Sequence, residues 1–340
     1  MKLRHIIFTA YALTLSSLAH TQDNCRPIET TDPKGSIWIT AEEIVRPGQY
    51  CLTHDIKAPR VSDFSSGGAR SYLGDMLPIT ASDVVFDLHG YMMNADASGV
   101  SGIHANHEWN KSFQRHITIR NGTIKSRTQS GIVLADMFGK MISLRSDVPD
   151  DKKFNYPAGL SESIFKSGVK DKPTDTNQYP ETVHIVERIK VEAGGVHNMR
   201  GGVIAIGMKG ASNIIRNSTI EVTDGHAAIY LFGPNQLIEN NIIIFKGKAA
   251  VESAAAIKLH QADGTIIRNN DIIIESSGDE APKAAISLID SKDVVIEGNR
   301  IYGIKTLTHN WDDKSNSVEK NNEFRSMLRR PWATGAPGVH

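Results

Sequence analysis

The chain has 340 residues, of which 38 are Lys or Arg and 38 are Asp or Glu, so its formal net charge is zero. The sequence has no basic tail or stripe that would hold nucleic-acid phosphates, and DNA or RNA is therefore not an expected partner. No segment combines the length of about 20 residues with the apolar character that a membrane span needs, which argues against a transmembrane protein.

The first residues have the pattern of a secretory signal. A basic start with Lys2 and Arg4 is followed by an apolar stretch from Ile6 to Leu18 and a small residue at Ala19. This pattern predicts a signal peptide over residues 1–19 and a mature protein that is secreted or periplasmic. Removal of Lys2 and Arg4 lowers the formal net charge from zero to about −2.

The two cysteines, Cys25 and Cys51, lie near the mature N-terminus. In an oxidising compartment they can close a loop worth about 3 kcal/mol by the chain-entropy model. The alternative is a metal ligand or a catalytic thiol. Because the pair lacks C-x-x-C spacing, we expect a structural disulfide and assign no metal site.

Seven later segments share a run of β-branched residues, one charge and a second apolar run. Aligned on the charge, they form a column that alternates in sign: Asp87, Arg120, Glu187, Arg216, Glu239, Arg268 and Glu297. If the segments stack as parallel strands about 4.8 Å apart, each carboxylate lies between guanidinium groups, whereas like charges there would repel. The column therefore predicts a register and no catalytic role.

The position after the charge is usually an Asn: Asn121, Asn217, Asn240 and Asn269, with Gly298 in the last segment. Asn and Gly tolerate a left-handed backbone best, so this column predicts a tight turn with stacked amides.

A second strand precedes each charge and alternates in character. Its predicted inward pairs are Ile103/Ala105, Ile132/Leu134, Ile204/Ile206, Ile229/Leu231, Ile257/Leu259 and Ile286/Leu288. Because strand side chains alternate between faces, these pairs predict one continuous apolar column.

The charged column recurs at 216, 239, 268 and 297, in steps of 23, 29 and 29 residues. A regular step with one column on one face predicts a coil rather than a sandwich. The sequence here resembles the right-handed parallel β-helix, or pectate-lyase-like, superfamily, whose I-x-x-N-x-I pattern implies the fold and no particular activity. The expected organisation is an all-β solenoid.

Four segments are expected in chain order. After the signal, residues 20–74 form an N-terminal cap and opening coil, and residues 75–303 form the β-helix. Residues 304–340 form a C-terminal cap or tail. Within the helix, the segment 137–182 is too long for an ordinary turn, so it is expected to be a functional loop or a disordered one.

Carbohydrate enzymes of the resembled superfamily work on an outward strand face walled by loops. One candidate cluster here is His104, Asn106 and His107 with Asp136 on the next coil. The carboxylate of Asp136 could orient His107 as a general base, with His104 and Asn106 binding substrate. A solvated surface pair is an equal alternative.

The second candidate cluster is Tyr230 and Phe232 on one coil, with Lys258 and His260 on the next and His226 at the strand entrance. A lyase that acts on a uronate polymer needs a base, a cation for the enolate-like intermediate, and an acid for the leaving oxygen. Lys258, His260 and Tyr230 can supply these roles, while Phe232 and His226 would bind the sugar. The alternative is aromatic packing under a loop and a solvated lysine.

Hydrolysis would need two carboxylates about 5–10 Å apart, and no two of Asp136, Asp224 and Asp290 fall on adjacent coils of this register. The N-T-D, D-D and G-H-G motifs of β-helix polygalacturonases are absent from the sequence. The aligned positions also lack the acidic triads of calcium-dependent pectate lyases, so the cofactor, calcium included, stays undetermined.

The sequence therefore predicts a polysaccharide-active protein, and a lyase or epimerase before a hydrolase, with a polysaccharide or other glycan as partner. The competing hypothesis is a non-enzymatic carbohydrate-binding or adhesion protein with the same groove. A metal-handling β-helix is a third, weak hypothesis, since the histidines show no ligand spacing. The sugar, its linkage and the oligomeric state are not determined by the sequence.

Overall fold

A computed structural model describes residues 25–29, 43–58, 75–96, 101–105, 114–126, 130–134, 179–194, 203–276 and 278–327. The predicted signal peptide and most of the long loop 137–182 lie outside these residues. The described residues form β-strands and one short 3₁₀ helix, η3 (Gly278–Glu280). Among them, no helix has the length and apolar character to cross a membrane.

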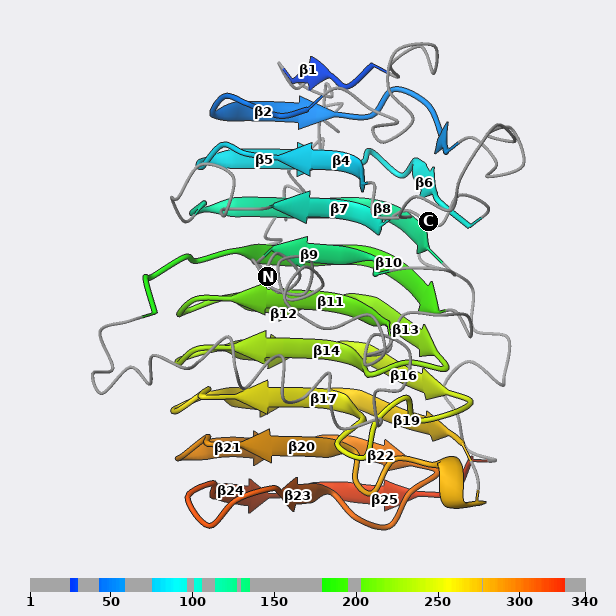
Figure 1. Ribbon diagram of the computed structural model, residues 1–340, viewed down its shortest axis with the longest axis vertical. Coiled ribbons are helices and arrows are strands. Elements are labelled where there is room, and N and C mark those ends of the chain that lie inside the picture. The colour runs from blue at the N-terminus through cyan, green and yellow to red at the C-terminus, as the bar shows by residue number, and fades with distance from the viewer. Residues whose placement is uncertain are drawn as a thin grey trace, which may run out of the picture.

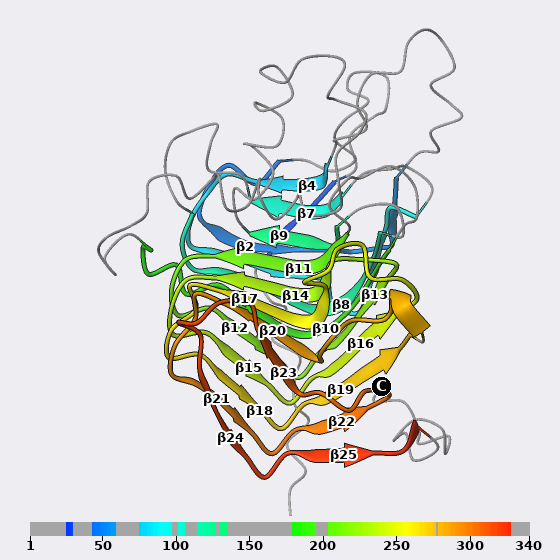
Figure 2. The ribbon, with the colours of Figure 1, turned by 60° about the horizontal axis from the view of Figure 1, so that its bottom comes forward.

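The strands pair in parallel and stack along one long axis, as Figure 1 shows. Seen nearer to that axis, the coils enclose an interior between three flat faces (Figure 2). The first, which we call the eight-stranded face, consists of β4 (Asp75–Ile79), β7 (Ser101–Ala105), β9 (Ile132–Leu134), β11 (Ile204–Lys209), β14 (Ala227–Phe232), β17 (Ala255–His260), β20 (Ile286–Ile289) and β23 (Thr308–Asn310).

The other two faces belong to a single bent sheet, because β8 (Ile117–Ser126) and β10 (Ile185–Gly194) run through both. We call the second face the ladder face. Besides parts of β8 and β10, it contains β1 (Arg26–Pro27), β2 (Gly48–Cys51), β5 (Val84–Asp87), β12 (Ile214–Arg216), β15 (Leu237–Glu239), β18 (Ile266–Arg268), β21 (Val294–Glu297) and β24 (Ser317–Lys320). The third face adds β3 (Ile56–Lys57), β6 (Met92–Asn94), β13 (Thr219–Thr223), β16 (Ile242–Lys246), β19 (Asp271–Glu275), β22 (Arg300–Tyr302) and β25 (Glu323–Arg325).

The alternating charges define the register of the ladder face, and this prediction is confirmed. Each charged residue of the column pairs with the next one predicted, from Asp87 to Glu297, and the column continues to Lys320. Arg120 Nε lies 2.7 Å from Asp87 Oδ2. Arg216 and Arg268 bond in the same way to the carboxylate of the preceding coil. The charges therefore stabilise stacking.

The turn after the charge is left-handed, as predicted. Asn121, Asn217, Asn240 and Asn269 have φ between 53° and 58°, and Gly298 has φ of 65°. In the coil of β10 the position is taken by Arg188, with φ of 50°. The stacked amides, however, lie one residue later than the sequence predicts: Asn241, Asn270, Asn299 and Asn322 bond from coil to coil. Asn241, Asn270 and Asn299 are buried, so their amides are shielded from water.

The interior is filled by the predicted apolar columns of the eight-stranded face, with one correction. Strand β11 is shifted by two residues, so that Ile206 and Met208, rather than Ile204 and Ile206, pair with Ile229 and Leu231. A two-residue shift keeps the alternation of faces, so the pattern alone could not detect it. Ile204 belongs instead to the outer apolar cluster with Tyr230 and Phe232, because the consecutive residues Ala205 and Ile206 both join the inner core and interrupt the alternation at the start of β11.

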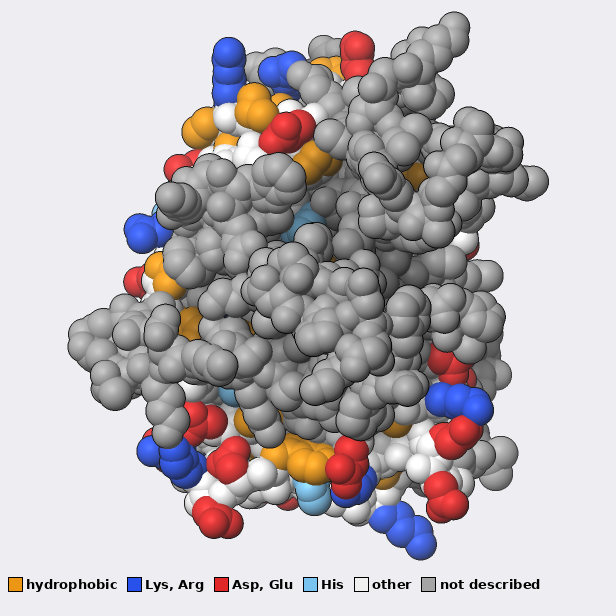
Figure 3. Space-filling model, viewed as in Figure 1, with side chains coloured by type: hydrophobic (Ala, Val, Ile, Leu, Met, Phe, Trp, Pro, Cys, Tyr) orange, Lys and Arg blue, Asp and Glu red, His pale blue; other side chains and the backbone are white. Residues whose placement is uncertain are grey.

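At both ends of the described solenoid, the terminal strands pair with the strands of the neighbouring coil. Strands β23, β24 and β25 follow Ile304, within the segment 304–340, and continue the register of β20, β21 and β22. At the other end, the predicted disulfide joins Cys25 to Cys51, and β1 pairs with β2. Charged side chains of both signs alternate over the described surface of the last coils (Figure 3).

Candidate functional site

The outward residues of the eight-stranded face form two columns. One column holds Gly207, Tyr230, Lys258 and Ser287, and the next holds Lys209, Phe232, His260 and Ile289. The outward pair of β11 is thus Gly207 and Lys209, and not Ala205 and Gly207, because of the two-residue shift. The register brings four of the predicted site residues together on β14 and β17: Tyr230, Phe232, Lys258 and His260.

Lys258 is the most unusual of these residues, because its side chain is fully buried on the outside of the sheet. Its Nζ lies 2.9 Å from Nε2 of His226, also fully buried, and donates to Oγ of Ser253. It also lies 5.1 Å from the centroid of the Tyr230 ring, within cation–π range. The interpretation of Lys258 as a solvated lysine is therefore wrong for this structure.

The aromatic residues form a continuous row across the two strands. His226 stacks on Tyr230 with centroids 5.1 Å apart, and Tyr230 lies 4.6 Å from Phe232. Phe232 in turn lies 4.8 Å from the His260 ring. The row results from the register, since Phe232 and His260 are cross-strand neighbours, and it fixes the rings around Lys258.

Two serines complete the cluster, and sequence reasoning missed both. Ser253 lies before β17, five residues from Lys258, and its hydroxyl receives a bond from the ammonium. Ser287 is the neighbour of Lys258 on β20, and its Oγ is buried with no hydrogen-bond partner among the described residues. The alignment of β17 with β20 could have indicated Ser287. No signal in the sequence points to Ser253, which lies outside the repeat.

A hydrogen-bonded chain borders the cluster. The Tyr179 hydroxyl donates to Gln261 Oε1, and Gln261 Nε2 donates to Asp290 Oδ2 at 3.1 Å. Burial, helped by the negative charge of Asp290, raises the pKa of the Tyr179 phenol to about 12. Tyr179 therefore stays protonated at neutral pH, and it packs against the outer apolar cluster that includes Tyr230 and Phe232.

A comparison of the sequence with protein-family models bears on the fold. Residues 201–331 match the model for the right handed beta helix region. The fold is a right-handed parallel β-helix. A comparison with curated proteins gives no match.

Solved structures similar to this β-helix include XylC in complex with xylose, at 14% identity and a TM-score of 0.40, covering 75% of this chain and 39% of that one. The enzymatically active domain of Bacteriophage CBA120 tailspike protein 2 matches at 11% identity and a TM-score of 0.35, covering 85% of this chain and 39% of that one. The Streptococcus pneumoniae surface protein and adhesin PfbA matches at 11% identity and a TM-score of 0.28, covering 84% of this chain and 89% of that one. The similarity assigns no activity to this chain.

The other predicted cluster of the β-helix is described only at His104. His104 is the cross-strand neighbour of Pro78 and Val133 on the eight-stranded face. Asn106, His107 and Asp136 lie outside the described residues, so the proposed pair of His107 and Asp136 stays a prediction.

Asp224 and Asp290, two of the acids predicted near this face, do not form a pair suited to glycoside hydrolysis. Asp224 precedes β14, and its Oδ1 accepts the backbone N–H of Lys248 at 2.7 Å. Asp290 follows β20 and accepts a bond from Gln261. The two acids thus lie at opposite ends of strands that are two steps apart, farther than the 5–10 Å or so that a catalytic pair needs.

Proposed function

We propose that the protein is a polysaccharide-active β-helix whose site is the cluster around Lys258 on β14 and β17, with a uronate-containing glycan as substrate and a lyase or epimerase reaction. The supporting observation is the fully buried side chain of Lys258, whose Nζ contacts Ser253 and His226 beside an aromatic row. A buried cation on the outer side of a sheet contributes nothing to the core and is costly to desolvate.

The chemistry assigned to the cluster follows from what the groups can do. Removal of the proton beside a uronate carboxylate builds negative charge on that carboxylate, and the Lys258 ammonium would stabilise it. In this proposal His260 and Tyr230 exchange a proton with the sugar ring or the leaving oxygen. The rings of Phe232 and His226 offer flat apolar faces to a pyranose, and the Ser287 hydroxyl offers a hydrogen bond.

The same burial sets a condition on this function. Tyr230 and Lys258 are fully buried, and Phe232 and His260 are nearly so. A glycan can contact them only if its binding is accompanied by a conformational change that opens this face. Binding is therefore expected to be slow compared with diffusion-limited association.

The alternative is a non-enzymatic glycan-binding protein, and the aromatic row is the observation that favours it. Four rings in contact form a surface suited to sugar stacking without any proton transfer. In that case Lys258 would only pair with a substrate carboxylate.

The test is incubation of the mature protein with acidic and neutral polysaccharides, following both the absorbance of unsaturated uronates and the appearance of reducing ends. A lyase raises both signals. Lys258→Ala and His260→Ala should abolish turnover and retain the far-ultraviolet circular dichroism of the wild type. Lys248→Ala, which removes an exposed lysine paired with Glu280, is the matched control and should keep full activity.

Reducing ends without absorbance would indicate hydrolysis and contradict the proposed reaction. Binding without turnover on every uronate polymer, weakened by Lys258→Ala, would support the glycan-binding alternative. Turnover that survives Lys258→Ala would place the active site elsewhere.

A further inference from the structure

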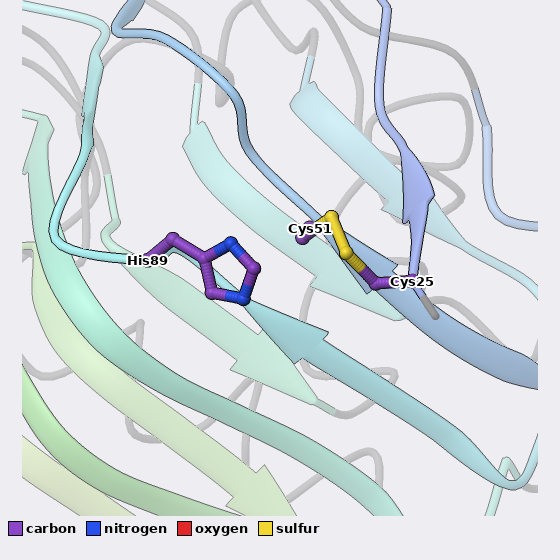
Figure 4. A group of neighbouring side chains, drawn as sticks. All are labelled: Cys25, Cys51 and His89. Atoms are coloured by element: carbon purple, nitrogen blue, oxygen red, sulfur yellow. A yellow bond between two sulfur atoms is a disulfide. The ribbon is translucent and has the colours of Figure 1, made fainter. Parts of the chain in front are cut away.

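A second cluster of reactive side chains lies at the N-terminal end of the β-helix, on the ladder face. Cys25 precedes β1, Cys51 ends β2, and His89 lies in the turn after β5. One ligand atom of each, the two sulfurs and a ring nitrogen, lie within 4.8 Å of one another. Figure 4 shows the imidazole of His89 beside the disulfide. The ends of three neighbouring strands of the ladder face therefore converge on one point.

From this arrangement we infer that the reduced protein binds a divalent metal ion of the Zn²⁺ type through Cys25, Cys51 and His89. Two thiolates and an imidazole form a donor set that suits Zn²⁺, with water in the fourth position. The disulfide and the metal exclude each other, because each uses both sulfur atoms. The proposal is independent of the function proposed for the Lys258 cluster.

The local geometry agrees with the dimensions of such a site. Zn–S bonds of about 2.3 Å at tetrahedral angles place two sulfurs about 3.8 Å apart. After reduction, the two Sγ atoms therefore need to separate by less than the length of one side chain to reach this distance. The Cα atoms of the two cysteines are 5.7 Å apart, and backbone pairing holds β1, which follows Cys25, in register with β2, which ends at Cys51. The ligands thus stay close to one another once the covalent bond is broken.

The carboxylate of Asp87 lies near the ring of His89. The His89 backbone N–H donates to Asp87 Oδ1 at 2.8 Å, and the His89 Nε2 lies 3.9 Å from the same oxygen. Asp87 is in turn held by Arg120 and Asn121 of the next coil. The side chain of His89 is one-third exposed, so a metal ion can reach it from solvent.

Formation of the two thiols requires a reductant of the dithiol or phosphine class. Two electrons and two protons convert the disulfide to two thiols, and the reductant is oxidised. Metal binding then releases the two thiol protons, so affinity rises with pH. Oxidation of the two thiolates would expel the metal and restore the disulfide.

The experiment uses the full chain, reduced with a phosphine, freed of reductant under an inert gas, and titrated with Co²⁺ as a spectroscopic probe. We expect one equivalent of Co²⁺ to give thiolate charge-transfer and tetrahedral ligand-field bands, which one equivalent of Zn²⁺ displaces. The disulfide form should give no bands. His89→Ala should weaken Co²⁺ binding at least about tenfold, and His54→Ala, which alters an exposed histidine outside the cluster, should not.

Reduced protein with two titratable thiols but no Co²⁺ bands would overturn the inference. So would equal Co²⁺ affinity for the wild type and His89→Ala. If reduction unfolds the chain, circular dichroism should return on addition of Zn²⁺ to the wild type and not to Cys25→Ser. A reduced chain that stays unfolded with Zn²⁺ would contradict the site as well.

Discussion

Lys258 shows why a buried charge is informative at the scale of one residue. Among the described residues, its Nζ contacts Ser253, His226 and the Tyr230 ring. If the lysine is kept for binding or catalysis, an apolar side chain of similar length should fill the same space, and the main cost to the fold should be the unpaired Ser253 hydroxyl.

Lys258→Met should lower the free energy of unfolding by only about 1–2 kcal/mol, because it leaves the buried Ser253 hydroxyl without its bond to Lys258, while glycan turnover or binding is lost. Urea denaturation and the glycan assays on the same preparation measure the two effects. Destabilisation of about 3–5 kcal/mol, as for a broken buried pair, would instead assign Lys258 a structural role.

A second prediction concerns the single residue His184. It is buried, and desolvation, together with the charge of His116, lowers the pKa of its imidazole from 6.5 to about 3. The unfolded chain therefore binds more protons than the folded one between these pH values. Stability is complete above about pH 6.5 and is lost as the pH falls toward 3, by at most about 1.4 kcal/mol per pH unit.

The measurement is the urea midpoint of the wild type and of His184→Gln between pH 7 and pH 5, where most carboxylates stay ionised. The wild type should lose stability over this range more steeply than the variant does. Equal slopes would mean that His184 is accessible to protons in the folded chain.

At the scale of elements, the ladder face depends on alternating charges. Arg268 donates to Glu239 Oε2 from Nε at 2.9 Å and from Nη2 at 2.7 Å, while the Arg268 side chain is 41% exposed. Since such a pair is screened by solvent, Glu239→Gln should cost only about 1 kcal/mol. Glu239→Lys should cost more, about 2 kcal/mol, because it places three cations in a row.

The check is urea denaturation of both variants and of the double variant Glu239→Lys with Arg268→Glu. The second change should restore part of the stability lost by the first. A double variant less stable than either single one would contradict the pairing of β15 with β18.

The buried amide ladder should contribute more than the charges do. Asn270 donates to the carbonyl of Ile238 and to Asn299 Oδ1, both at 3.0 Å, and it accepts the backbone N–H of Asn241 at 2.9 Å. Asn270→Ala leaves these groups unpaired without water, which should cost about 3 kcal/mol. The loss should appear as a lower urea midpoint.

Asn269→Gly is the matched control, since Gly298 takes the equivalent position one coil later with the same left-handed backbone. It should stay within about 0.5 kcal/mol of the wild type. If Asn269→Gly lowered the free energy of unfolding more than Asn270→Ala does, the stabilising amides would be those of the turn column that contains Asn269.

The elements were largely predictable because two periodic constraints act together. Alternation of apolar residues defines the faces, and the alternating charges from Asp87 to Glu297 define which residues are neighbours. The shift of β11 and the position of the amide ladder were missed because neither changes the alternation of faces. Residues beyond Ile304 carry Lys320 in the charge column, a signal that could have extended the register by one coil.

At the scale of the whole molecule, the sequence could place Tyr230, Phe232, Lys258 and His260 side by side because they lie within the repeat. It could not predict that Lys258 is buried or that Ser253 holds it, because Ser253 lies in a connection without periodicity. Contacts of this kind depend on how loops fold over a regular face. The sequence repeat of a solenoid therefore predicts its strands better than its functional sites.

In the proposed reaction, this face removes the ring proton beside a uronate carboxylate, and proton NMR of uronate polymers in deuterated water follows that proton. With the wild type, we predict either new vinyl signals, from a lyase, or loss of the ring-proton signal by exchange with deuterium, from an epimerase. Both should disappear with Lys258→Met. Unchanged ring-proton signals in every uronate polymer that the wild type binds would contradict the claim.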